Sequence, residues 1–337
     1  MLKSILDPGS RPQLRALAGL TAVLMLSSTM MPVANVYAEA AATDSSVTSS
    51  DVTAALSGTA GILSASDSVA TVADGDSAMI ATTDGAKVDI PKNPSDPVAL
   101  GLADNSSPPI AIDLPSGDTA ADAQKVAPGV VAYPNDNGSA SAVQAVEDGS
   151  LRMLTIIDNA SAPDTYDYKV TLPGGGHVEL VPDGSAIVLD NDGQITATAS
   201  APWAKDANGK IVPTYFSTDG STLTQHVKHR TAGVVYPVTA DPWWAPARVD
   251  HVTWVNTKWG RSLHVYMTWY GYTTSFLVPG TAFDEVMQKA HIGWSGSMYN
   301  QFVCHADLAP PWKESWNLDT WRPDVGLWQT LLKKCNP

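Results

Sequence analysis

The side chains best suited to catalysis or ligand binding lie in one short stretch, residues 301–323. The stretch reads QFVCHADLAPPWKESWNLDTWRP and contains one of the chain's two cysteines, a histidine, three tryptophans and an arginine that precedes proline. Such a density of Trp, His and Arg is typical of a pocket or an interface. It matches no catalytic motif with a known mechanism, so it predicts where a site lies without naming its reaction.

His305 is the candidate acid or base of this stretch. A helix over residues 298–308 would place His305 on the same face as Gln301, four residues earlier, and would turn Asp307 about 200 degrees away from it. Asp307 is therefore a poor partner despite its nearness in sequence. The loop over residues 316–322 is the more suitable source of a partner for the imidazole.

Within that loop, Asp319 would orient the imidazole, and Arg322 would bind a carboxylate or phosphate in bidentate fashion. The predicted catalytic residues are therefore His305, Asp319 and Arg322, and the predicted binding residues are Gln301, Trp316, Asn317 and Trp321. The alternative, which we favour, is structural. In it His305 is buried with its hydrogen bonds satisfied, Asp319 and Arg322 form a salt bridge, and Trp312, Trp316 and Trp321 belong to the core.

The two cysteines, Cys304 and Cys335, are predicted to form a disulfide, because both fall on expected helices of an exported chain. Closing a loop with 30 residues inside it would contribute about 3 to 4 kcal/mol on the chain-entropy model. The alternative is a reactive thiol beside His305, which would leave the second cysteine unexplained.

The elements that must position these residues are short strands and helices. Residues 252–255 and 262–269 alternate as strands around a turn at 256–261. A helix is expected from Thr281, with Asp284 completing a capping box. The buried face of this helix is expected to consist of Phe283, Val286, Met287 and Ala290. A last helix, capped by Asp324, is expected to bury Val325, Trp328, Leu332 and Cys335.

Residues 66–241 have a different pattern, in which Asp-Gly or Asn-Gly turns separate short runs of Val, Ile, Leu, Tyr and Thr. Such spacing predicts many antiparallel strands in a sandwich or stacked meander. The clearest expected strands are 151–157, 166–172, 177–181, 186–189, 195–199 and 234–238. We therefore expect a multidomain chain, with an all-β N-terminal module followed by a small α+β C-terminal domain.

Charge and tryptophan content divide the chain near residue 245. Residues 39–245 contain 9 Lys and Arg against 26 Asp and Glu, whereas residues 246–337 contain 8 against 7. Ten of the 11 tryptophans lie at or after Trp243. The predicted boundaries are 65–244 for an acidic β-rich module and 245–337 for a Trp-rich domain. The acidity of the first is explained by solubility.

The N-terminal residues predict export. Basic residues, an apolar run over 14–31 and Val36-Tyr37-Ala38 are typical of a cleaved signal peptide, residues 1–38. The alternative is an uncleaved anchor, for which the apolar run is short. Residues 39–64 are rich in Ala, Ser, Thr and Asp, and we expect a disordered linker there. The predicted location is outside the cell, with no membrane span after cleavage.

Two resemblances follow from these motifs. Segments 147–150, 157–163, 166–173 and 201–204, with the closing YPVTADPWW of residues 236–244, resemble a β-rich module of secreted actinobacterial proteins. That resemblance implies a carrier with a variable domain behind it. The motifs QFVCH, SWNL, WRP and CNP, between residues 301 and 337, are similar to an uncharacterised C-terminal domain family of secreted actinobacterial, including mycobacterial, proteins. That family implies no activity.

Two functional classes remain open. One is a secreted effector or toxin-like hydrolase that uses His305, Asp319 and Arg322. The other is a non-catalytic module that binds cell-envelope glycan or a partner protein through tryptophans. No phosphate loop, zinc motif or other cofactor signature is present, so we expect no metal and no cofactor. The nearly neutral C-terminal half argues against nucleic acid bound through a basic surface.

Overall fold

The structure is a computed structural model that describes residues 46–59, 63, 71–83, 85–310 and 312–337. The predicted signal peptide, residues 1–38, lies outside the described residues. So do residues 39–45, 60–62 and 64 of the predicted linker.

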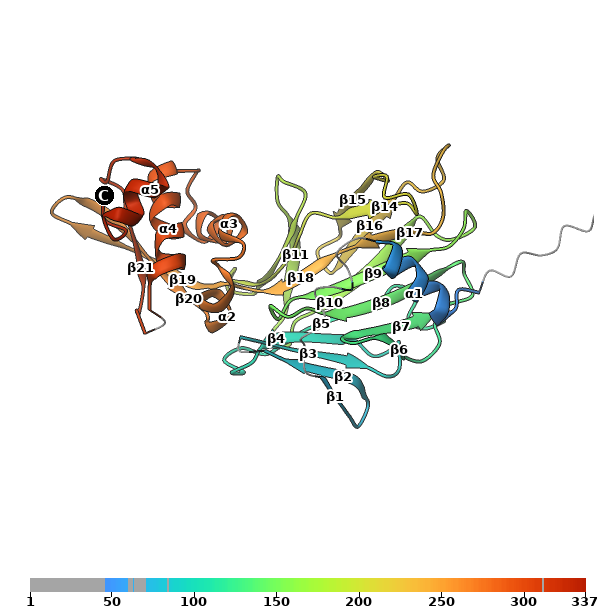
Figure 1. The fold of residues 1–337 in the computed structure, drawn as a ribbon. Coiled ribbons are helices and arrows are strands. Elements are labelled where there is room, and N and C mark those ends of the chain that lie inside the picture. The colour runs from blue at the N-terminus through green and yellow to red at the C-terminus, as the bar shows by residue number, and fades with distance from the viewer. Residues whose placement is uncertain (1–45, 60–62, 64–70, 84, 311) are drawn as a thin grey trace, which may run out of the picture. The chain divides into compact units, whose positions relative to one another are not determined.

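Two antiparallel sheets make up the β-rich region (Figure 1). The first has eight strands, in the order β1 (Thr71–Asp74), β2 (Ser77–Thr82), β3 (Ala86–Pro91), β4 (Val98–Leu102), β5 (Ile110–Ile112), β10 (Thr165–Thr171), β16 (Thr222–Val227) and β15 (Thr214–Thr218). The second has ten, in the order β11 (Gly176–Leu180), β12 (Ala186–Asp190), β13 (Ile195–Ala199), β18 (Trp243–Pro246), β9 (Leu151–Ile157), β8 (Ser139–Ala145), β7 (Val130–Pro134) and β6 (Gln124–Ala127), with β17 (Val238–Asp241) joining β9 to β14 (Trp203–Lys205).

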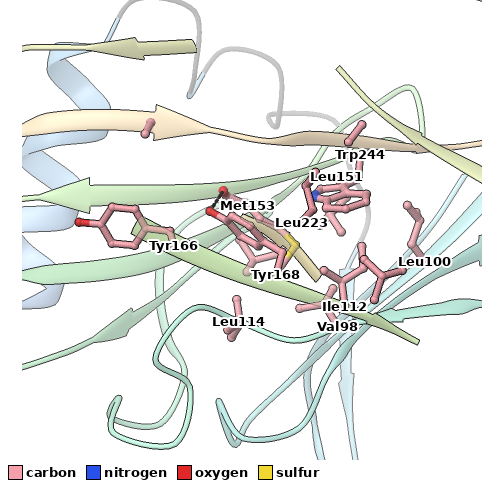
Figure 2. Close-up of a cluster of buried hydrophobic side chains, with 14 of the residues drawn as sticks. Val98, Leu100, Ile112, Leu114, Leu151, Met153, Tyr166, Tyr168, Leu223 and Trp244 are labelled. Carbon is pink, nitrogen blue, oxygen red and sulfur yellow. Dashed lines mark hydrogen bonds between the residues drawn. The ribbon is translucent and has the colours of Figure 1, made fainter. Parts of the chain in front are cut away.

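The core of this region lies between the two sheets, as in a β-sandwich. Figure 2 shows Ile112 of the first sheet and Leu151 of the second packed around Tyr168 and Trp244. The Tyr168 hydroxyl donates to the backbone carbonyl of Met153 at 3.4 Å, so the phenol is buried with its polar atom paired. The expected all-β architecture is confirmed.

A helix, α1 (Ser49–Gly58), stands where the sequence predicted a disordered linker. Thr48 and Asp51 form its capping box. Val52 and Leu56 are buried in a cluster with side chains of β7, β8 and β9. The linker prediction is wrong for these residues, because two apolar side chains one turn apart and a good cap are enough when a sheet face is available to cover them.

The C-terminal region, residues 248–337, is the small α+β unit that we expected. Its sheet has the antiparallel order β19 (Val249–Thr257), β20 (Gly260–Met267) and β21 (Trp316–Asp319), and its helices are α2 (Trp269–Thr274), α3 (Pro279–Ala290), α4 (Gly296–Leu308) and α5 (Gly326–Leu332). One sheet face meets α3 and α4 in a core that contains Leu263, Trp316 and Leu318 with Phe283 and Phe302. In the part of the chain that is described, no helix is long and apolar enough to cross a membrane.

Two expected helix features in this region are wrong. First, α3 begins at Pro279 without a side-chain cap, so Thr281 and Asp284 form no capping box. Proline is suited to the first helical turn because its missing N–H would be unpaired there in any case. Secondly, α5 follows neither its predicted cap nor its predicted stripe. Its N-cap is Val325, without a side-chain hydrogen bond, and not Asp324. Trp328 is 70% and Leu332 58% exposed.

A buried ion pair anchors α3 to the start of β19. A carboxylate oxygen of Glu285 accepts hydrogen bonds from the backbone N–H groups of Arg248, at 2.7 Å, and Val249, at 3.1 Å. The Arg248 guanidinium lies 3.5 Å from the other oxygen and donates to the Tyr270 hydroxyl at 3.2 Å. Glu285 and Arg248 are 2% and 4% exposed, so each buried charge needs the opposite charge to offset the free energy of its desolvation.

We expect Glu285→Ala to lower the free energy of unfolding by about 3 to 5 kcal/mol, because it leaves the Arg248 charge buried and unpaired. Urea denaturation of the whole chain measures the loss. Asp307→Ala removes an exposed carboxylate from α4 and serves as the control, with an expected change within about 0.5 kcal/mol. Equal losses in the two variants would contradict the anchoring role of Glu285.

Candidate functional site

A disulfide joins Cys304 of α4 to Cys335, with the two Cα atoms 5.4 Å apart. The predicted disulfide is therefore present, and both cysteines are buried. Cys335 lies beyond the end of α5, where its backbone is left-handed, with φ of 66°. The bond therefore ties the chain after α5 to the helix that carries His305.

Gln301 fastens the edge of β21 to α4. Its side-chain oxygen accepts from the backbone N–H of Asp319 at 2.8 Å, and its amide nitrogen donates to the backbone carbonyl of the same residue at 3.1 Å. Gln301 is fully buried. The structure thus places this predicted binding residue inside the region, where it pairs backbone groups that a sheet edge would leave open.

His305 is buried beside Trp316 as a neutral imidazole. Its Nδ1 donates to the backbone carbonyl of Gln301 at 2.7 Å, and its ring is stacked near the Trp316 indole with centroids 6.3 Å apart. Burial lowers the pKa of His305 to about 4, and the nearby positive charge of Lys313 adds to this. The orienting group is a helix carbonyl, and no carboxylate takes that role.

Asp319 and Arg322 form an ion pair on the other face of the sheet. Strand alternation turns Leu318 toward the helices and Asp319 away from them. One Asp319 oxygen accepts from Ser262 at 2.7 Å, and the other from Arg322 Nε at 2.9 Å. Arg322 also donates to an oxygen of Pro337 at 3.1 Å. These two side chains are brought together, whereas the hydrogen bond of the His305 imidazole goes to the Gln301 carbonyl and not to Asp319.

The remaining predicted residues also divide between the two faces. Trp316 is 1% exposed within the core. Asn317 is half-buried and its side-chain oxygen accepts from Ser315 at 2.8 Å. Trp321 is half-buried against Trp259, with ring centroids 6.3 Å apart.

The end of the β19–β20 hairpin carries residues 256–261, for which the sequence predicts a turn. Trp259 is 65% exposed. The Lys258 ammonium lies 4.3 Å from the centroid of the Trp259 ring, and the Arg261 guanidinium lies 4.0 Å from that of Trp254. We call Trp254, Lys258, Trp259, Arg261 and Trp321 the hairpin-end cluster. A signal was present in the sequence, since a Trp between Lys and Gly inside a tight turn has no strand face through which to reach the core.

No group of three or more His, Cys, Asp or Glu side chains in the described residues is arranged to hold a metal ion. The chemistry on offer in the C-terminal region is therefore of two kinds. One is the buried imidazole of His305, which is bonded to a helix carbonyl, and the other is the hairpin-end cluster, in which Lys258, Trp259 and Arg261 are exposed.

Comparison with known proteins places residues 249–337 in a match with a family model described as "Protein of unknown function (DUF2599)". Three similar proteins are "Uncharacterized protein Mb0487" of Mycobacterium bovis and "Uncharacterized protein MT0495" and "Uncharacterized protein Rv0477" of two Mycobacterium tuberculosis strains. Each is 36% identical over 102 residues, which cover 28% of this chain and 68% of the relative.

The burial of His305 predicts a pH dependence of stability. The imidazole has a pKa near 6.5 when unfolded and about 4 when folded. As the pH falls below 6.5, the unfolded chain takes up a proton that the folded chain refuses, so folding is progressively disfavoured until about pH 4. We expect His305→Gln to remove about 3 kcal/mol of acid destabilisation across this window.

Urea denaturation of the wild type and of His305→Gln at pH 7, 5.5 and 4 measures the effect. The expected result is that the wild type loses more stability on acidification than the variant. His251→Gln, which replaces a half-exposed ring, shows what the loss of a histidine does by itself. Parallel wild-type and His305→Gln curves would show that the imidazole is not held neutral.

Proposed function

Since the chain belongs to the DUF2599 family, whose description assigns no activity, we propose from the geometry that its C-terminal region is a non-catalytic module that binds cell-envelope glycan. The observation that carries this proposal is Trp259. Its indole is 65% exposed at the end of a hairpin, and Trp321 lies against it at a tilt of 33°. An exposed indole that is held in place by a second indole offers a rigid apolar surface in water.

A glycan suits such a surface. One face of a pyranose ring presents C–H groups, which pack on an indole, while the hydroxyl groups at its rim need polar partners. The side chains of Asn256, in the hairpin, and of Thr320, whose hydroxyl donates to the Arg261 carbonyl, are exposed and polar. Large side chains that change conformation little on binding lose little entropy, which favours affinity.

The catalytic alternative receives no support from the geometry. His305 is 4% exposed and donates to a helix carbonyl, and both Asp319 oxygens are occupied by Ser262 and Arg322. A general base must lie within hydrogen-bonding reach of a substrate proton. These three residues instead support the structural interpretation.

We also infer that the protein acts outside the cytoplasm and that the β-rich region, up to about residue 244, carries the C-terminal region. The signal-like composition of residues 1–38 and the Cys304–Cys335 disulfide support export. The location of the disulfide and of the exposed indoles beyond residue 245 supports assigning the binding function to that part of the chain.

We expect Trp259→Ala to weaken binding of the whole chain to insoluble mycobacterial cell-wall glycan by about tenfold or more, as for a central aromatic contact. Co-sedimentation at increasing glycan concentration measures the binding, and thermal unfolding confirms that the variant is folded.

Trp312→Ala is the matched control, because this indole is 84% exposed and lies outside the hairpin. It should bind like the wild type. No sedimentation of the wild type, or equal losses in both variants, would contradict the proposed function.

A further inference from the structure

The hairpin end stands out in its charge from the rest of this acidic chain. The formal net charge of the protein is -14, yet residues 251–283 contain no Asp or Glu and include Lys258 and Arg261. Both side chains are exposed. An anion that approaches the hairpin end therefore meets two positive charges, while the one carboxylate of the hairpin, Asp250, lies at the opposite end of β19.

Among the described residues, the two cations lie beside aromatic rings and form no ion pair. The Lys258 ammonium lies 4.3 Å from the centroid of the Trp259 ring, and the Arg261 guanidinium lies 4.0 Å from that of Trp254. Such contacts at exposed sites hold a cation only weakly. Both charges are thus near an apolar surface and remain able to bind an acidic group.

The turn that carries Lys258 and Trp259 is fixed by its own hydrogen bonds. The Thr257 hydroxyl donates to the Gly260 carbonyl at 2.8 Å and accepts from the Trp259 N–H at 3.2 Å. Gly260 has φ of +145°, and a Cβ there would lie 3.0 Å from the Trp321 ring. Trp321 therefore rests directly on the glycine, and the turn presents its indole and its ammonium in a preset arrangement.

We propose that the hairpin-end cluster binds an acidic saccharide, with a sugar ring on Trp259 and its carboxylate or phosphate group on Lys258 and Arg261. This inference rests on the proposed function and adds the chemical class of the ligand. Arg261 offers two parallel N–H donors to an oxyanion, whereas Lys258 offers a mobile point charge.

The composition of the hairpin favours a glycan over a lipid surface. Among its described residues, 249–267, Trp259 is the one large apolar side chain with high exposure. Segments that enter a membrane interface bury several apolar side chains on one face in addition to their basic residues. A single indole between polar neighbours is better matched to one sugar ring.

The test uses the whole chain and insoluble mycobacterial cell-wall glycan in three forms: untreated, with its carboxylates converted to neutral amides, and with its phosphodiesters removed by acid. We expect the affinity to fall about tenfold in one of the treated forms, which identifies the acidic group, and to fall with rising salt. Lys258→Gln and Arg261→Gln should each weaken binding to untreated glycan by about threefold to tenfold and lose the difference between the forms.

Lys333→Gln, which removes an exposed cation close to the chain end, is the matched control and should bind like the wild type. Equal binding to all three forms would overturn the acidic ligand while leaving glycan binding intact. Absence of binding to untreated glycan would overturn the proposed function together with this inference. Binding to phosphatidylglycerol vesicles more tightly than to untreated glycan would show that the cluster recognises a lipid surface, and would also overturn it.

Discussion

The side-chain amide of Gln301 holds the outer edge of β21 by bonding to both backbone groups of Asp319. A strand of four residues at a sheet edge has few ladder bonds of its own, so these two bonds decide its position. Once β21 is fixed, alternation sends Trp316 and Leu318 toward the helices and Asn317 to the opposite face. The separation of the buried imidazole from the polar face of the sheet follows from this arrangement.

Much of the fold could be predicted because its signals are local. The strands at 151–157 and 195–199 have the predicted bounds, since Asp-Gly and Asn-Gly turns mark strand ends clearly. The strand expected at 234–238 was wrong: β17 begins only at Val238, after a proline that lacks an N–H donor. The sequence predicts a loop for the four residues of β21, because a strand this short shows too little alternation and depends on a helix far away in sequence.

The candidate site was harder to predict, because it depends on which side chains have partners already. The disulfide follows from the number of cysteines and the expected compartment. The ion pair of Asp319 with Arg322 follows from their spacing, but the Ser262 bond to the same carboxylate comes from another strand. The density of polar residues in the sequence therefore marks a part of the C-terminal region whose polar side chains already have hydrogen-bond partners. The exposed chemistry lies at the turn of residues 256–261, where Trp259 has no core to enter.

The disulfide also affects how the chain can be produced. Thr330 is the buried residue of α5, while Trp328 and Leu332 remain in water, so burial contributes little to holding this helix in place. The covalent bond from Cys335 to α4 adds to the hydrogen bonds that Ser297 and Asn300 of α4 make with Arg322 and Asp324, just before α5. In a reducing cytosol the two thiols would stay unbonded. The segment that contains α5, with its exposed apolar side chains, would then detach from α4 and associate with other chains. Recombinant expression should therefore need an oxidising compartment or a refolding step to give a monodisperse product.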